Sequence, residues 1–145
     1  MLQTLSKAWG LAAARVGIAY ANIQIISYLN KIKPPYNIST PNQVAALQAL
    51  KNIARYKLQK SILLEQKELV VTELEKLDIV KNVYPSDANF VLIEVTAADT
   101  IYNSLVNNNI IIRNRDKVIK NCLRITIGTP QENTALIAAL KNIKP

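Results

Sequence analysis

The side chains best suited to chemistry lie near the N-terminus of the chain, around Lys7. Thr4 and Ser6 place hydroxyl groups just before this lysine, and Arg15 follows eight residues after it, with small and apolar residues between. A lysine held near a cationic arginine and away from water favours the neutral amine, which can condense with an aldehyde. Two hydroxyls and a guanidinium suit a phosphate dianion. These residues predict a site for pyridoxal phosphate, which carries both an aldehyde and a phosphate. The alternative, judged from spacing alone, is that Lys7 is an ordinary solvated lysine.

A second candidate is Arg124, which stands in the apolar run of residues 123–127. Burying an arginine in an apolar strand costs free energy unless an anion pairs with it. That anion is either a group on a substrate or a carboxylate of the chain, such as Asp116. Composition and spacing leave both alternatives open.

Composition excludes several kinds of site. The chain has no histidine, which removes the commonest general base and most zinc sites, so no metal site is predicted. The single cysteine, Cys122, cannot form an internal disulfide, and without a histidine to activate it we expect a small buried side chain. Chemistry must therefore depend on the remaining polar residues or on an imported cofactor.

The net charge of +8 is unevenly distributed, because eight of the 18 Lys and Arg residues precede Glu65, the first acidic residue. Such an excess suits an anionic cofactor, an acidic partner surface or nucleic acid. No run of Lys and Arg interleaved with aromatic residues is present, so no nucleic-acid partner is predicted.

The first 21 residues have some features of a targeting segment, since residues 19–21 mimic a small-x-small cleavage site. Arg15 within the preceding apolar stretch argues against a secretory signal. No segment approaches the roughly 18–20 uninterrupted apolar residues of a membrane span. We therefore expect a cytoplasmic protein without a membrane partner.

Hydrophobic periodicity predicts an α/β arrangement to position these candidates. Strands are predicted over residues 16–20, 80–84, 89–95, 110–113 and 123–127. Helices are predicted over residues 23–31, 40–52, 53–77, 97–107 and 130–143. The predicted N-caps are Asn22, Thr40 and Thr129, the last in a capping box with Glu132. Residues 1–15 are expected to be irregular, and the strand at 16–20 to lack a partner, so residues 1–20 would belong to a domain that is mostly missing.

The segment from Thr4 to Gly17 resembles the signature T-x-S-K-A-F-G-L-A-G-x-R-x-G of fold-type I pyridoxal-phosphate-dependent aminotransferases, in the branch that contains histidinol-phosphate aminotransferase. Trp9 replaces the usual phenylalanine and Ala13 the usual glycine. Residues 122–129 are similar to the family's C-L-R-I-[ST]-[VI]-G-T motif. Weaker similarities, which extend the resemblance over essentially the whole chain, lie at residues 33–39 (KPPYNIS), 85–90 (PSDANF) and 112–114 (IRN).

The resemblance implies an α/β fold: the C-terminal small domain of a fold-type I enzyme, with a mixed or antiparallel sheet and packed helices, plus a stub of the large domain. Residues 1–21 would end the large domain, residues 22–53 would form interdomain helices and a linker, and residues 54–145 would form the small domain. The family's contacts to the cofactor ring lie upstream of the lysine. The chain is therefore expected to lack half of its active site, to be inactive alone, and to work as a homodimer.

By the same resemblance, Lys7 would bind the aldehyde of the cofactor, pyridoxal 5'-phosphate, and move the proton between substrate carbon and cofactor. Thr4, Ser6 and Arg15 would hold the cofactor phosphate.

Arg124 would bind the carboxylate of an amino-acid substrate, and in this branch the substrate phosphate as well, with help from Arg113. The interval of eleven residues between these arginines is slightly shorter than is usual in the family, which leaves the loop over residues 114–121 and the exact substrate open.

The implied function is transamination between histidinol phosphate and 2-oxoglutarate in histidine biosynthesis. One alternative is a related enzyme, such as a threonine-phosphate decarboxylase or another amino-acid aminotransferase. The other is a non-catalytic chain that only folds and associates.

Overall fold

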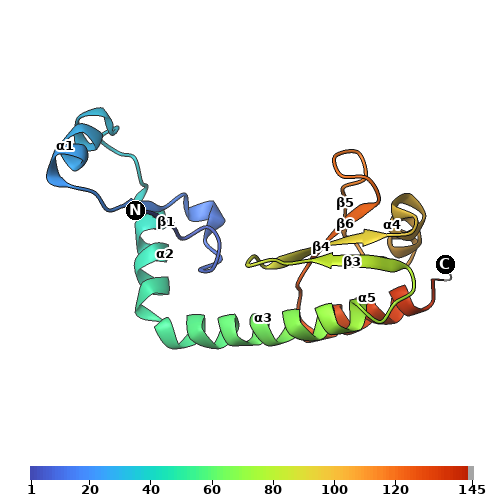
Figure 1. Ribbon diagram of the computed structural model, residues 1–145. Coiled ribbons are helices and arrows are strands. Elements are labelled where there is room, and N and C mark those ends of the chain that lie inside the picture. The colour runs from blue at the N-terminus through green and yellow to red at the C-terminus, as the bar shows by residue number, and fades with distance from the viewer. Residues whose placement is uncertain (144–145) are drawn as a thin grey trace. The chain divides into compact units, whose positions relative to one another are not determined.

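The computed structural model describes residues 1–143 and divides the chain into two compact units, one over residues 1–60 and one from residue 61 onward (Figure 1). Helix α3 (Ile53–Leu74) runs through the boundary in the sequence. None of the helices over residues 1–143 is both long enough and apolar enough to span a membrane.

The first unit begins with a short antiparallel hairpin. Strands β1 (Leu2–Thr4) and β2 (Gly17–Ala19) pair with Leu2 opposite Ala19 and Thr4 opposite Gly17. The prediction that the strand at 16–20 has no partner in the chain is therefore wrong. The three residues of β1 are too few to show alternation, and the pairing depends on a long connecting loop that periodicity does not reveal.

Helices α1 (Ile23–Ile32) and α2 (Thr40–Lys51) follow. The Asn22 side chain accepts a hydrogen bond from the Ile25 amide at 2.9 Å, so the predicted N-cap of α1 is confirmed. The predicted cap of α2 is wrong by one residue. Thr40 is the first helical residue, and Ser39 takes the cap position without a side-chain hydrogen bond.

The second unit contains a four-stranded antiparallel sheet in the order β3-β4-β6-β5. The strands are β3 (Val80–Tyr84), β4 (Phe90–Val95), β5 (Arg113–Asn114) and β6 (Cys122–Thr126). The predicted strand at 110–113 is displaced, because only its last residue pairs with β6. The fold class expected from the sequence is confirmed.

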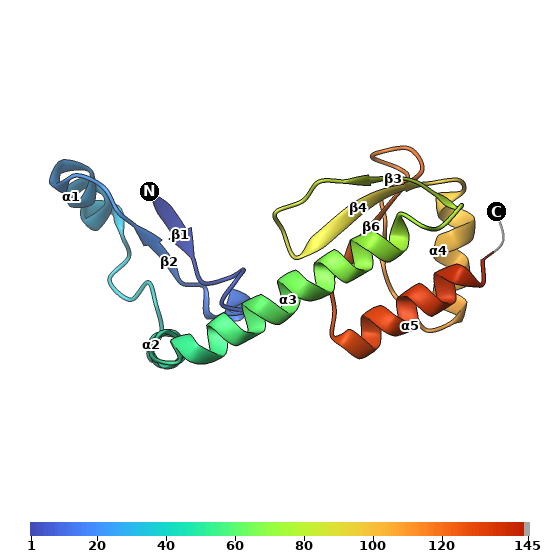
Figure 2. The same ribbon diagram turned by 60° about the horizontal axis from the view of Figure 1, so that its bottom comes forward.

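The helices of this unit cover one face of the sheet. Residues of β4 alternate between half-buried and buried, and Val91, Ile93 and Val95 enter the core. The core side chains contributed by the helices come from the second half of α3, α4 (Ala98–Asn107) and α5 (Pro130–Lys141): Val70, Leu74, Ile101, Leu105, Leu136, Ile137 and Leu140. Figure 2 shows α3 and α5 side by side beneath this face.

The start of α5 is fixed by the predicted capping box. The Glu132 amide donates to Thr129 Oγ1 at 3.3 Å, and the Thr129 amide donates to Glu132 Oε2 at 2.7 Å. The buried Asn133 then bonds both backbone groups of Gly128 and the Gln66 side chain of α3. The start of α5 is thereby tied to the strand that precedes it and to α3.

Glu73 joins α3 to α5 through an ion pair with Lys141 at 2.6 Å and also pairs with Lys76 at 2.5 Å. The hydrogen bond from Lys141, with that from Lys76, lowers the pKa of Glu73 from 4.5 to about 2. A carboxylate whose pKa is lower in the folded state stabilises the fold above its unfolded pKa and loses that effect as it is protonated.

We therefore expect the stabilisation from Glu73 to be complete above about pH 5 and to disappear as the pH falls toward about 2. Unfolding by urea, measured from pH 2 to pH 7, should show a difference between the unchanged chain and Glu73→Gln that closes over this window. Glu75→Gln removes an exposed carboxylate immediately after the end of the same helix and is the matched control. A difference between Glu73→Gln and the unchanged chain that is constant with pH would contradict the assignment.

Candidate active site

Two arginines face each other across neighbouring strands of the second unit. In the antiparallel register, Arg113 of β5 lies directly opposite Arg124 of β6. The neighbours of Arg124 along β6, Leu123 and Ile125, enter the core, so Arg124 projects from the opposite face, and Arg113 shares that face. Like charges directly opposite each other destabilise a sheet. The pair is therefore a cationic site that a bound anion would stabilise.

The guanidinium of Arg124 lies over an aromatic ring. Its Cζ is 4.9 Å from the ring centroid of Phe90 on β4. Phe90 is opposite Thr126 in the register, and Thr126 lies two residues along β6 from Arg124. The side chains of Phe90 and Arg124 are therefore diagonal neighbours on one face of the sheet. A ring under a guanidinium limits its orientation and attracts its charge. Sequence reasoning missed Phe90, because the alternation of β4 gives the face of its side chain but not the register that sets it beside Arg124.

The turn before Phe90 is held by α3. Lys67 donates from Nζ to the carbonyl oxygens of Ser86 and Ala88. The Ser86 hydroxyl in turn donates to the carbonyl of Phe90 at 2.6 Å. The backbone that carries the Phe90 ring is therefore held to α3 by these hydrogen bonds.

Among residues 1–143, no carboxylate forms an ion pair with Arg124. Its Nε is buried and makes no hydrogen bond within the part of the chain that the structure describes. Asp116, the carboxylate that sequence analysis left as an alternative, pairs with Lys120 at 3.1 Å and accepts a bond from the Asn121 amide. A buried donor without a partner costs about 1 to 3 kcal/mol, and a bound group that accepts a hydrogen bond from Arg124 Nε would remove this cost.

Lys7 lies in the loop of the hairpin in the first unit. The Gly10 amide donates to the carbonyl of Lys7 at 2.8 Å, which closes a turn, and Gly10 has a φ of 67° that favours glycine. The Leu11 amide donates to the carbonyl of Leu5 at 2.9 Å, and Leu5 is buried. The loop is folded on itself, and it leaves Lys7 exposed.

The other residues predicted to bind the cofactor lie at the same end of the hairpin. The Ser6 amide donates to Thr4 Oγ1 at 3.1 Å, so these two residues are in contact. The Leu5 amide donates to the carbonyl of Val16 at 3.2 Å. Because Ser6 follows Leu5 and Arg15 precedes Val16, this hydrogen bond brings Ser6 and Arg15 to the same end of the β1–β2 hairpin. The Arg15 guanidinium itself donates to the carbonyl of Ala12 at 3.1 Å, and none of its described hydrogen bonds goes to Thr4, Ser6 or Lys7.

An aromatic pair anchors this loop within the first unit. The Trp9 ring stacks on Tyr56 of α3 with centroids 4.2 Å apart and planes at 15°. The two rings also line a cavity of about 550 Å³ together with Arg55, Gln48 and Asn52. Stacked aromatic rings bury a large area and fix relative orientation, so the backbone two residues after Lys7 is held in place.

A comparison with known protein families identifies the family of this chain. Residues 1–140 match the family described as aminotransferase class I and II. The chain belongs to this family. Its hairpin loop with Lys7 and its sheet with Arg113 and Arg124 are therefore parts of an aminotransferase class I and II fold.

Individual proteins of known family are similar to this chain over nearly its whole length. A histidinol-phosphate aminotransferase of Parabacteroides distasonis is 49% identical over 146 residues, covering 99% of this chain and 42% of the relative. A solved histidinol-phosphate aminotransferase of Clostridium acetobutylicum is 25% identical with a TM-score of 0.85, covering 97% of this chain and 44% of that one. An L-threonine-O-3-phosphate decarboxylase of Porphyromonas gingivalis shares the fold, with a TM-score of 0.81 at 24% identity over 97% of this chain and 45% of that one. The chain spans about two fifths of the length of the curated relatives it matches.

Proposed function

We propose that this chain contributes the cofactor lysine and the substrate-binding arginines to a pyridoxal-phosphate-dependent aminotransferase that acts on histidinol phosphate and 2-oxoglutarate, a step of histidine biosynthesis. The observation that carries the proposal is the cationic pair Arg113 and Arg124, in which Arg124 Nε is buried without a partner. Both substrates are anions, one through a phosphate and the other through carboxylates. An arginine presents a planar fork of donors that suits either group. One site can therefore serve both half-reactions of a ping-pong exchange.

The residues around Lys7 fit pyridoxal phosphate. An exposed amine can react with the aldehyde, while the paired Thr4 and Ser6 and the nearby Arg15 offer hydroxyl, amide and guanidinium donors to the phosphate. No carboxylate occurs in residues 1–60 to repel that phosphate. Binding would require the Arg15 guanidinium to leave the carbonyl of Ala12.

When bound, the cofactor supplies an electron sink for a carbanion next to the substrate nitrogen. The chain's own contribution is to bind, orient and transfer a proton. Arg124, with Arg113, fixes the anionic end of the substrate, and Phe90 limits the swing of the Arg124 guanidinium. The Lys7 amine would take the proton from the substrate carbon and deliver it to the cofactor carbon, as amino-group transfer requires.

The positive excess in residues 1–60 would be balanced by the cofactor phosphate, by the residues that complete the cofactor site and by a second subunit. Activity would belong to the completed homodimer and not to the isolated chain. A cytoplasmic location stays a prediction.

The experiment that tests the proposal is a chimera. The Parabacteroides distasonis relative keeps its own remaining residues, and its 146 matching residues are replaced by this chain. We expect the chimera to transfer the amino group of histidinol phosphate to 2-oxoglutarate. Carbon dioxide release from threonine phosphate, without amino transfer, would replace transamination by the decarboxylase alternative. A folded chimera that does neither would leave the non-catalytic alternative.

A further inference from the structure

The edge strand β5 is poorly supported by the sheet itself. It has two residues, Arg113 and Asn114, and it pairs with β6 on one side only. Strand ends and edges are the parts of a sheet that fray most readily. Arg113 is exposed, so little packing of its own side chain fixes its position beside Arg124.

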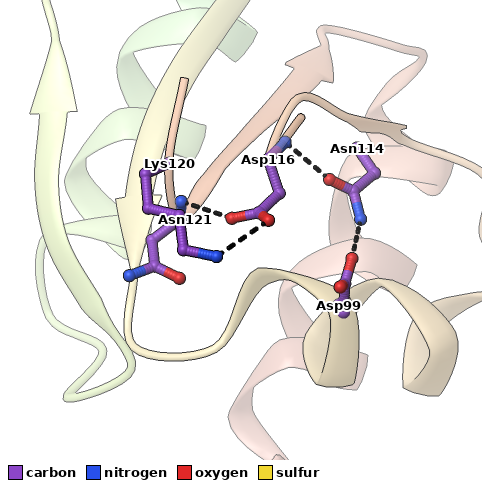
Figure 3. Close-up of polar contacts among 5 residues, drawn as sticks. All are labelled: Asp99, Asn114, Asp116, Lys120 and Asn121. Atoms are coloured by element: carbon purple, nitrogen blue, oxygen red, sulfur yellow. Dashed lines mark hydrogen bonds and ion pairs between the residues drawn. The ribbon is translucent and has the colours of Figure 1, made fainter. Parts of the chain in front are cut away.

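Asn114 supplies the missing support from the other face. Successive side chains of a strand point to opposite faces, so Asn114 projects toward the helical layer when Arg113 projects away from it. Its Nδ2 donates to Oδ1 of Asp99, in the first turn of α4, at 2.6 Å, and its Oδ1 accepts from the Asp116 amide at 2.8 Å (Figure 3). One amide side chain therefore ties β5 both to a helix and to the loop that follows.

Asp116 extends the same network to the start of β6. Its Oδ1 accepts from the Asn121 amide at 2.6 Å, and its Oδ2 pairs with Lys120 at 3.1 Å (Figure 3). These contacts, the bond from Asn121 first, hold the pKa of Asp116 below its usual range. Asn121 has a φ of 54°, a left-handed turn that closes the loop, and its carbonyl accepts from the Val95 amide of β4 at 2.9 Å. Arg124 follows three residues later.

We propose that Asn114 is a positioning residue for the anion site: through Asp99 and Asp116 it fixes β5 so that Arg113 stands beside Arg124 and both bind one anionic group. This inference rests on the proposed function, because it assigns Asn114 a role in the site formed by the two arginines. The network joins the strand of one arginine to the loop that leads into the strand of the other. Its loss would separate the two guanidinium groups without removing either.

The geometry offers a variant with its own rescue. Asn114→Asp keeps an acceptor for the Asp116 amide and places a carboxylate against that of Asp99, so it breaks only the bond to α4. Adding Asp99→Asn exchanges donor and acceptor and restores the bond. The exchange shows whether an effect depends on the bond between residues 114 and 99, and a variant that lacks Arg113 then shows whether that effect acts through Arg113.

The experiment uses the full chain and inorganic phosphate as the probe, followed by nuclear magnetic resonance of the arginine Nε–H groups. In the unchanged chain we expect phosphate to shift the signals of Arg113 and Arg124. Asn114→Asp should raise the dissociation constant about tenfold, typical of one broken coupling, and should weaken the cross-strand contacts between residues 113 and 124. Asp99→Asn should restore both. In an Arg113→Gln background, Asn114→Asp should have no further effect on the affinity.

Each other outcome overturns a separate statement. If phosphate shifts neither arginine in the unchanged chain, the anion site of the proposed function is wrong and the role of Asn114 falls with it. If phosphate binds but Asn114→Asp leaves its affinity unchanged, only the positioning role is wrong. An equal loss of affinity with and without Arg113 would also overturn it, because Asn114 would then act through something other than Arg113.

Discussion

Replacing Lys7 by alanine is expected to abolish transamination by the chimera, lowering kcat by about 10⁴-fold or more, because covalent binding and proton transfer are lost together. Lys7→Arg keeps the positive charge but offers no free amine, so it should be as inactive as Lys7→Ala. The measurement is the rate of glutamate formation from histidinol phosphate and 2-oxoglutarate.

Lys51→Ala, which removes an exposed lysine from the last turn of α2, is the control for loss of one charge and should retain full activity. Activity of Lys7→Arg close to that of the unchanged chimera would show that Lys7 acts through its charge and not through its amine. The assignment of Lys7 as the catalytic residue would then be wrong.

Arg124→Gln is expected to lower kcat/KM for both substrates by about 10²- to 10³-fold, equivalent to about 3 to 4 kcal/mol, the usual effect of removing one partner of a largely buried charged contact. The same change removes one of two like charges that lie opposite each other. The free energy of unfolding should therefore stay the same or rise slightly, so that binding and stability move in different directions. Steady-state kinetics and urea unfolding measure the two quantities.

Lys81→Gln, which removes an exposed positive charge from β3 of the same sheet, is the matched control for Arg124→Gln. It should change neither quantity appreciably. A fall in stability of Arg124→Gln comparable to its loss of kcat/KM would mean that the guanidinium has a structural partner and serves the fold.

The second unit could be predicted well because its elements have regular patterns. The run Phe90–Val95 alternates, and the structure buries every second residue of it as alternation requires. Thr129 and Glu132 have the spacing of a capping box, and the box forms. Both signals are local, so neighbouring residues were enough to find them.

The parts that were missed depend on contacts between distant residues. β1 forms only because a twelve-residue loop brings β2 back beside it. The three residues of β1 contain no pattern that predicts this pairing. Phe90 lies under Arg124 because of a register between β4 and β6, which a single strand does not specify. Arg113 and Arg124 were named from the sequence, but their direct opposition is likewise a result of pairing.

Trp9 is the single tryptophan of the chain and lies two residues after Lys7. Its ring is stacked on that of Tyr56. All indole fluorescence of the protein therefore originates beside the proposed cofactor lysine. Any molecule that reacts with Lys7, or any rearrangement of its turn, would change emission from that one ring. Excitation of Tyr56 would reach the same ring by energy transfer at contact distance. The chain carries an intrinsic, label-free optical probe of its own candidate reactive loop.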